Sequence, residues 1–156
     1  IMLSTVRMIT LNEPFASLMA FNNKNETRNR DTKVRGLVAI HAAKMPYNNE
    51  IMRKLCSPKI LSIIDKLVPF RLTNRSKIVS IGYLVGTKFM GDHPDDKELI
   101  ESKCYVNYNP DLWIWEFEDM TPVEPVFMKG KQGWSILTYE QKQLLNPLPC
   151  PATQPK

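Results

Sequence analysis

Apolar positions along the chain fall into several short runs that are typical of β-strands. Residues 5–11 (TVRMITL) are apolar or β-branched at most positions, which predicts a strand buried on most of both faces. Residues 36–41 (GLVAIH) predict a second strand and residues 112–120 (LWIWEFEDM) a later one. Residues 77–90 predict a long strand, in which Gly82 and Gly86 indicate bulges that let a sheet curl.

Helical spacing of apolar residues appears between and after these strands. We expect a helix over 13–20, with Asn12 as its side-chain cap, and two consecutive helices within 47–67. The other expectations are a short strand at 26–28, a loop and short helix over 92–102, an irregular extended segment over 122–131 and a closing helix over 138–145.

Strands with helices between and after them, without a strict βαβ rhythm, favour an α+β fold over a doubly wound one. We interpret residues 1–145 as one domain, and residues 146–156, with four prolines, as a disordered or polyproline tail. The six glycines are scattered and form no phosphate-binding loop, which argues against a nucleotide-triphosphate enzyme.

The net charge of +5 conceals an uneven distribution. Residues 1–90 carry fifteen Lys or Arg against five Asp or Glu, and residues 91–156 carry six against eleven. A charge of about +10 followed by about −5 predicts a basic face that attracts phosphates. The alternative is a solvated surface on which the charges happen to be unevenly distributed.

No apolar run is long enough to span a bilayer, and residues 1–11 do not form a signal peptide, so we expect a cytoplasmic protein with no membrane contact. Three cysteines and two histidines, widely spaced, argue against a disulfide framework and against a metal site. We expect no cofactor.

Three segments, in order, resemble the ASCH family, a branch of the PUA-like β-barrels. The first is LNEPFASLMAF (residues 11–21), and the second is KNETRNRDTKVRGLVAIHAAK (residues 24–44). The third is the pair GYLVGTKFMGDHP and WIWEFEDMTPVEPVFMKGKQGW. The resemblance implies a PUA-like β-barrel with peripheral helices and a role in binding RNA or modified bases. One difference is that Phe21 and Asn22 stand where the family has a glycine, with only Asn25 between Lys24 and Glu26.

Lys24, Glu26 and Arg28 are the first candidates for ligand binding. Glu26 and Arg28 project to one face if this piece is extended. Arg28 can hold a phosphate or a guanine edge in a bidentate fork, and Glu26 can accept from an exocyclic amine or orient Arg28. The alternative is that Glu26 and Arg28 simply brace the barrel by pairing with other groups, since structural ion pairs are common.

Further ligand-binding candidates are basic or aromatic residues in the same segments: Phe15, Arg30, Arg35, His41, Lys44, Lys129, Lys131 and Trp134. His41, on an apolar strand, is more typical of a satisfied core histidine. Trp113, Trp115 and Phe117 alternate along one strand and are more typical of a core than of a stacking platform.

The leading functional hypothesis is a binding module whose basic cleft accepts single-stranded RNA or a nucleotide, including a modified nucleobase. The resemblance also leaves open an enzyme, either an amidohydrolase acting on N4-acetylcytidine or a ribonuclease, for which Lys24 and Glu26 are the catalytic candidates. Glu26 stands where the amidohydrolases have a threonine, although Thr27 is adjacent. A minor alternative is an adaptor that binds a protein partner through the tail or the 48–67 helices.

Overall fold

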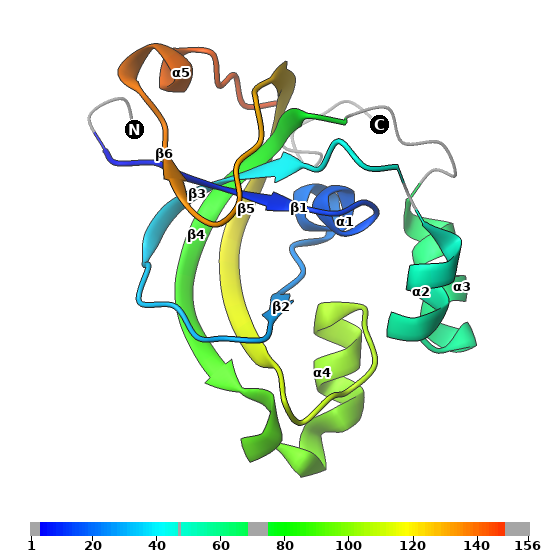
Figure 1. Cartoon of the computed structure of the whole chain (residues 1–156). Helices are drawn as coiled ribbons and strands as arrows, with labels where there is room; N and C mark the ends of the chain where they lie inside the picture. Colours follow the sequence, from blue (N-terminus) through cyan, green and yellow to red (C-terminus); the bar gives the residue numbers. More distant parts are fainter. Residues whose placement is uncertain (1–3, 47, 69–74, 149–156) are drawn as a thin grey trace, which may run out of the picture.

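In the part of the chain that the structure describes, six strands form one strongly curved, mixed sheet in the order β2-β5-β4-β3-β1-β6 (Figure 1). The computed structural model describes residues 4–46, 48–68 and 75–148. The strands are β1 (Arg7–Leu11), β2 (Glu26–Arg28), β3 (Gly36–Ala42), β4 (Lys77–Phe89), β5 (Trp113–Phe127) and β6 (Ser135–Ile136). Strands β1 and β3 are parallel, and the other pairs are antiparallel.

The curl of the sheet comes from register shifts along its long central strands. The β4–β5 pairing shifts between Ile81 and Tyr83 and again between Leu84 and Gly86, so the bulges predicted at Gly82 and Gly86 are confirmed. A Cβ at Gly82 would lie 2.9 Å from the Cα of Met120, which explains the glycine there. Edge strands β2 and β6 are not paired with each other within the described residues, so the sheet is a half-barrel.

Strand β5 is longer than the sequence predicts, because it continues through the segment expected to be irregular. The chain on its free side supplies partners for this extension: the N–H of Glu124 donates to the carbonyl of Asn146 at 2.9 Å, and that of Leu148 to the carbonyl of Pro122 at 2.8 Å. Residues 146–148, expected to belong to a disordered or polyproline tail, are therefore bonded to the sheet. The rest of the predicted tail, residues 149–156, lies outside the described residues.

The described residues also form five α-helices, and two 3-10 turns precede the fourth. They are α1 (Phe15–Asn22), α2 (Asn49–Leu55), α3 (Pro58–Leu67), η1 (Met90–Asp92), η2 (Pro94–Asp96), α4 (Lys97–Cys104) and α5 (Tyr139–Gln143). The two consecutive helices expected within 47–67 are confirmed. Each begins at a side-chain cap, since Asn48 accepts from the N–H of Ile51 and Ser57 from that of Ile60.

The prediction that the Asn12 side chain caps α1 is wrong. The helix begins at Phe15, and it is the backbone carbonyl of Asn12 that accepts the N–H groups of Phe15 and Ala16. The carboxylate of Glu13 accepts both the N–H and the hydroxyl of Ser17, at 2.9 and 2.8 Å. The Asn12 side chain is thereby left exposed for other contacts.

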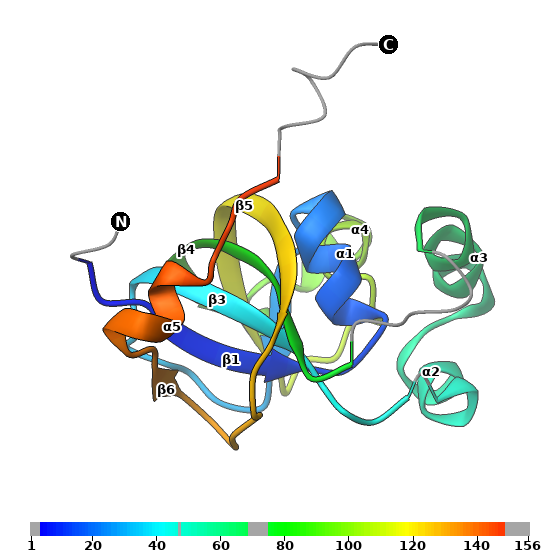
Figure 2. The ribbon, with the colours of Figure 1, turned by 90° about the horizontal axis from the view of Figure 1, so that it is seen from above.

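Helix α1 lies between the concave face of the sheet and the α2–α3 pair (Figure 2). Met19 and Ala20 pack with Ile40 and Phe117 of the sheet, whereas Leu18 packs with the inner faces of α2, α3 and α4. The opposite face of the sheet has its own cluster, built from β1, β4 and the segment around Leu137. None of the helices described is both long and apolar enough to cross a membrane.

The buried carboxyl of Glu13 gives a test of this packing. Burial raises the pKa of Glu13 above 4.5, although the two hydrogen bonds from Ser17 oppose the shift. Between 4.5 and the raised pKa the unfolded chain loses this proton before the folded chain does, so stability falls as pH rises through that range.

We expect Glu13→Gln to remove this component of the pH dependence. In urea unfolding series from about pH 4 to about pH 8, the free energy of unfolding of the variant should improve relative to the wild type as pH rises. A gap between the two proteins that stays constant across that range would contradict a raised pKa at Glu13.

Candidate functional site

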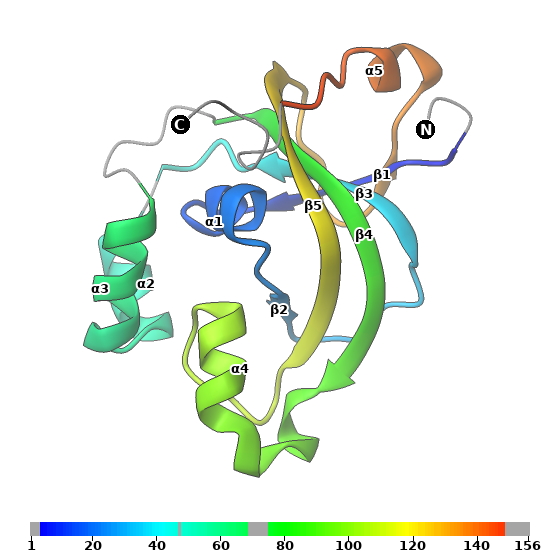
Figure 3. The same ribbon diagram turned by 180° about the vertical axis from the view of Figure 1, so that it is seen from behind.

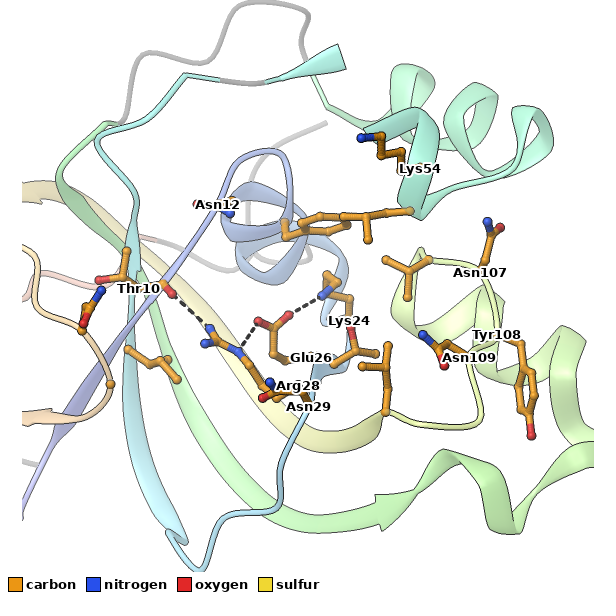
Figure 4. Close-up of a pocket in the computed structure, with 18 of the residues that line it drawn as sticks. Thr10, Asn12, Lys24, Glu26, Arg28, Asn29, Lys54, Asn107, Tyr108 and Asn109 are labelled. Carbon is orange, nitrogen blue, oxygen red and sulfur yellow. Dashed lines mark hydrogen bonds and ion pairs between the residues drawn. The ribbon is translucent and has the colours of Figure 1, made fainter. Parts of the chain in front are cut away.

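A cleft of about 850 Å³ opens where β1 and β2 face α2 and the loop that follows α4 (Figure 4). Its walls come from six parts of the chain: residues 9–12 at the end of β1, Phe15 of α1, residues 24–29 around β2, residues 54–55 of α2, the loop 106–112 and the loop 131–133. These segments are far apart in sequence, so the cleft exists only in the folded chain.

The floor of the cleft carries a chain of three charged side chains. Lys24 Nζ donates to Glu26 Oε1 at 3.1 Å, and Arg28 Nε donates to Glu26 Oε2 at 3.0 Å. Their side chains are 1%, 11% and 31% exposed, in the order Lys24, Glu26, Arg28. The single carboxylate is therefore shared by a buried ammonium and a guanidinium that still reaches solvent.

Two asparagines position this chain of charges. Asn23 ends α1 in a left-handed conformation, and its side chain accepts the N–H of Met120. Asn25 accepts the N–H of Phe117 through its side chain and donates its own N–H to the carbonyl of Lys103. Figure 3 shows the resulting arrangement, with α4 beside β2 and the beginning of β5.

Arg28 is fixed along one edge of its guanidinium. Nε is bonded to Glu26, Nη2 donates to the carbonyl of Thr10 at 3.1 Å, and the guanidinium carbon lies 5.6 Å from the centre of the Trp115 ring. Nη1 makes no hydrogen bond within the described part of the chain. The other end of the fork is thus free to contact a ligand in the cleft.

Lys24 is held against the aromatic ring of Phe15, with its ammonium 5.0 Å from the ring centre. Two cysteines lie near it, but burial raises the pKa of Cys56 and of Cys104 to about 11, in spite of the nearby Lys24 charge. The raised pKa keeps both thiols protonated at neutral pH.

The lining of the cleft is rich in amide groups and contains more cationic side chains than carboxylates. Four cationic residues line it, Lys24, Arg28, Lys54 and Lys131, against one carboxylate, Glu26. Five carboxamides are also among its lining residues: Asn12, Asn29, Asn107, Asn109 and Gln132. Such a surface attracts anions and offers paired donors and acceptors. No group of three or more His, Cys, Asp or Glu side chains in the described residues is arranged to hold a metal ion.

The structure places five of the eleven sequence candidates in the cleft wall: Phe15, Lys24, Glu26, Arg28 and Lys131. Arg30 and Arg35 are exposed on the loop between β2 and β3, where Arg35 donates to the carbonyls of Thr32 and Val34. Lys44 and Lys129 are also exposed and lie outside the lining.

His41 and Trp134 are not among the residues that line the cleft, and both make contacts within the protein. His41 is 1% exposed, with Nδ1 3.0 Å from the Thr10 hydroxyl and Nε2 2.7 Å from the Met128 carbonyl. Because a carbonyl only accepts, Nε2 carries the proton and the ring is fully bonded. Trp134 stacks on the buried Trp115 at 5.6 Å, and the expectation that Trp115 and Phe117 belong to the core is confirmed.

Sequence reasoning missed the wall that faces Arg28. Lys54 at the end of α2 and residues 107–109 form it (Figure 4). Asn107 joins the loop to the helices, since its side chain accepts the N–H of Ser57 and its own N–H donates to the carbonyl of Leu55. The sequence NYNP at residues 107–110 is typical of a turn, and only its two asparagines indicate that it could contact a ligand.

No protein-family profile matches the sequence, and no curated protein sequence matches it significantly. Solved structures do match the fold. A tyrosine-to-phenylalanine variant of the ASCH protein of Zymomonas mobilis superimposes with a TM-score of 0.55 at 12% identity, over 90% of this chain and 95% of that one. A serine-to-alanine variant gives 0.54 at 12% identity, over 88% and 92%. The ASCH structure without those changes gives 0.50 at 12% identity, over 88% and 91%.

The half-barrel with its helical caps is thus an α+β fold. More particularly, it is the fold of an ASCH domain, so the resemblance inferred from the sequence is confirmed at the level of the fold.

Proposed function

We propose that the protein is an RNA- or nucleotide-binding module whose cleft accepts a nucleotide of a single-stranded RNA. The observation that carries the proposal is the free end of the Arg28 guanidinium inside a cleft with four cations and one carboxylate. A fork held on one edge presents its remaining donors to a phosphate or to a guanine edge with little loss of side-chain entropy.

The other lining residues suit the remaining parts of a nucleotide. Phe15 and Tyr108 offer aromatic surface in the cleft, and the amide groups of Asn12, Asn29 and Asn109 can both donate and accept. Lys54 and Lys131 are exposed cations at the cleft wall, where they can approach backbone phosphates. The ASCH-type fold supports this class of function, because the resemblance of the sequence to the ASCH family implies a role in binding RNA or modified bases.

Replacing Arg28 with alanine is expected to weaken binding of a short single-stranded RNA by about tenfold or more, since a charge-assisted fork is lost. Glu26 keeps its bond to Lys24, so the fold should persist. The matched control is Arg53→Ala, an exposed arginine of α2 outside the cleft lining.

Fluorescence anisotropy with a labelled trinucleotide at fixed salt measures both variants, and circular dichroism confirms that they are folded. Equal affinities for Arg28→Ala and the wild type would count against the proposal, as would the absence of any binding by the wild type.

The second candidate function is an enzyme, and the observation that favours it is that Lys24, Glu26 and Thr27 all line the cleft. The ion pair to Glu26 and the exposure of only 1% make Lys24 a poor proton carrier without rearrangement. Incubation with N4-acetylcytidine and with RNA, followed by mass spectrometry, separates the two functions. A product that forms with the wild type but not with Lys24→Ala would establish that the protein is an enzyme. Binding of a ligand that stays unchanged would support the binding module.

A further inference from the structure

Four cationic residues lie on neighbouring backbone segments at one end of the sheet, outside the cleft lining. They are Lys44, Arg75, Lys77 and Lys129, and we call them the basic cluster. Two backbone hydrogen bonds bring their segments together, because the N–H of Ser76 donates to the carbonyl of Ala42 and the N–H of Met128 donates to the carbonyl of Ser76, both at 2.9 Å.

The basic cluster lacks counterions within the described residues. Lys44, Arg75 and Lys129 are exposed, Lys77 is half-buried, and none of them belongs to an ion pair of the described chain. Along β5, the nearest carboxylate is Glu124, three residues before the Phe127 that pairs with Lys77. Like charges gathered without counterions raise the local potential and attract a polyanion.

The basic cluster is continuous with the cleft. Only Gly130 separates Lys129 from Lys131 of the cleft wall, so their backbones are at most about 7 Å apart. The connecting segment is fixed, because His41 Nε2 donates to the carbonyl of Met128 at 2.7 Å. Gly130 also lies against His41, since a Cβ there would be 3.0 Å from the ring carbon Cε1.

We propose that the ligand is a single-stranded RNA that continues out of the cleft, with its backbone phosphates on the basic cluster. This inference rests on the proposed function and deepens it: the ligand is a polynucleotide, and Arg75 and Lys77 join its binding surface. A free nucleoside or mononucleotide would end inside the cleft and leave the four cations without a role. Phosphate contacts of this kind position the strand and carry no base specificity.

The test compares a trinucleotide with a dodecanucleotide of mixed sequence, both single-stranded RNA, by fluorescence anisotropy over a series of salt concentrations. The variant is the double change Arg75→Ala and Lys129→Ala. Its matched control is Lys59→Ala with Lys66→Ala, which removes two exposed cations from α3. All four changes replace exposed side chains, so the fold should be unaffected.

For the dodecanucleotide, the cluster variant should lose affinity. The slope of log K against the logarithm of the salt concentration should also be smaller in magnitude by about 1.4, which is the contribution of two phosphate contacts on a single strand. The trinucleotide, confined to the cleft, should bind the cluster variant and the wild type equally. The control should match the wild type with both ligands.

Failure of this inference and failure of the proposed function give different results. An unchanged slope for the cluster variant, in a protein that still needs Arg28 for the trinucleotide, would overturn the inference and leave the binding module in place. A wild type that binds neither RNA would overturn both. An equal loss in the control would show that only net charge matters, which would also overturn the inference.

Discussion

Replacing Glu26 with glutamine is expected to destabilise the fold by about 3–5 kcal/mol, because it leaves the buried Lys24 ammonium without a counterion. The side chain of Lys24 is 1% exposed, and its one polar contact of the described chain is the carboxylate at 3.1 Å. Glutamine keeps the shape of the side chain but brings no charge, and Arg28 then adds a second cation to the same place. Urea unfolding at neutral pH measures the loss.

Two further variants make this expectation specific. Lys24→Met should cost much less than Glu26→Gln, since Glu26 keeps its bond to Arg28 and methionine fills the space of the lysine stem. The double variant Lys24→Met with Glu26→Gln should be more stable than Glu26→Gln alone, because no buried charge is left unpaired. If the double variant instead lost the sum of the free energies of unfolding lost by the two single variants, the result would contradict this expectation.

Replacing Trp115 with alanine is expected to cost about 3–5 kcal/mol as well, for a different reason. Trp115 is 2% exposed, stacks on Trp134 and lies under the Arg28 guanidinium. Its ring N–H also donates to the carbonyl of Arg30 at 3.0 Å. The substitution therefore opens a cavity and releases two segments next to the cleft.

Trp113→Ala is the matched control, two residues earlier on the same strand. Trp113 is half-buried and packs against Phe89, so its loss should be clearly smaller in the same urea unfolding experiment. Any Trp115 variant that remains folded should also bind RNA more weakly, since Arg28 loses its support. Equal losses at the two tryptophans would show that burial of Trp115 is not what stabilises this region.

The shared carboxylate explains why the site tolerates a lysine in its floor. Glu26 neutralises Lys24 and at the same time orients Arg28, so the charge available to a ligand is concentrated on the exposed end of the fork. In the proposed function, Lys24 and Glu26 set the position of Arg28, while Lys54 and Lys131 supply cations at the rim. Glu26 and Arg28 therefore fit both the structural and the ligand-binding interpretation. The ion pair that holds Arg28 in place also orients its free end toward a ligand.

The sequence by itself determined most of the regular structure. Strands β1, β3 and β4 follow from local alternation of apolar side chains, and Gly82 and Gly86 mark the bulges because a side chain there meets the next strand. The α2–α3 pair follows from helical spacing and two caps close in sequence. Motif order was enough to indicate the ASCH fold and to select Lys24, Glu26 and Arg28.

Only the tertiary structure decided the rest, because it depends on partners distant in sequence. Strand β5 extends past its prolines because β4 pairs with it as far as Phe127, and residues 146–148 bond to its other side at residues 122–124. No local pattern encodes these partners. His41 and Trp134 are residue types that often bind ligands. In the folded chain, His41 is hydrogen-bonded to the carbonyl of Met128 and Trp134 stacks on Trp115. The facing wall of the cleft and the basic cluster likewise arise where separate segments meet, which periodicity within one segment cannot predict.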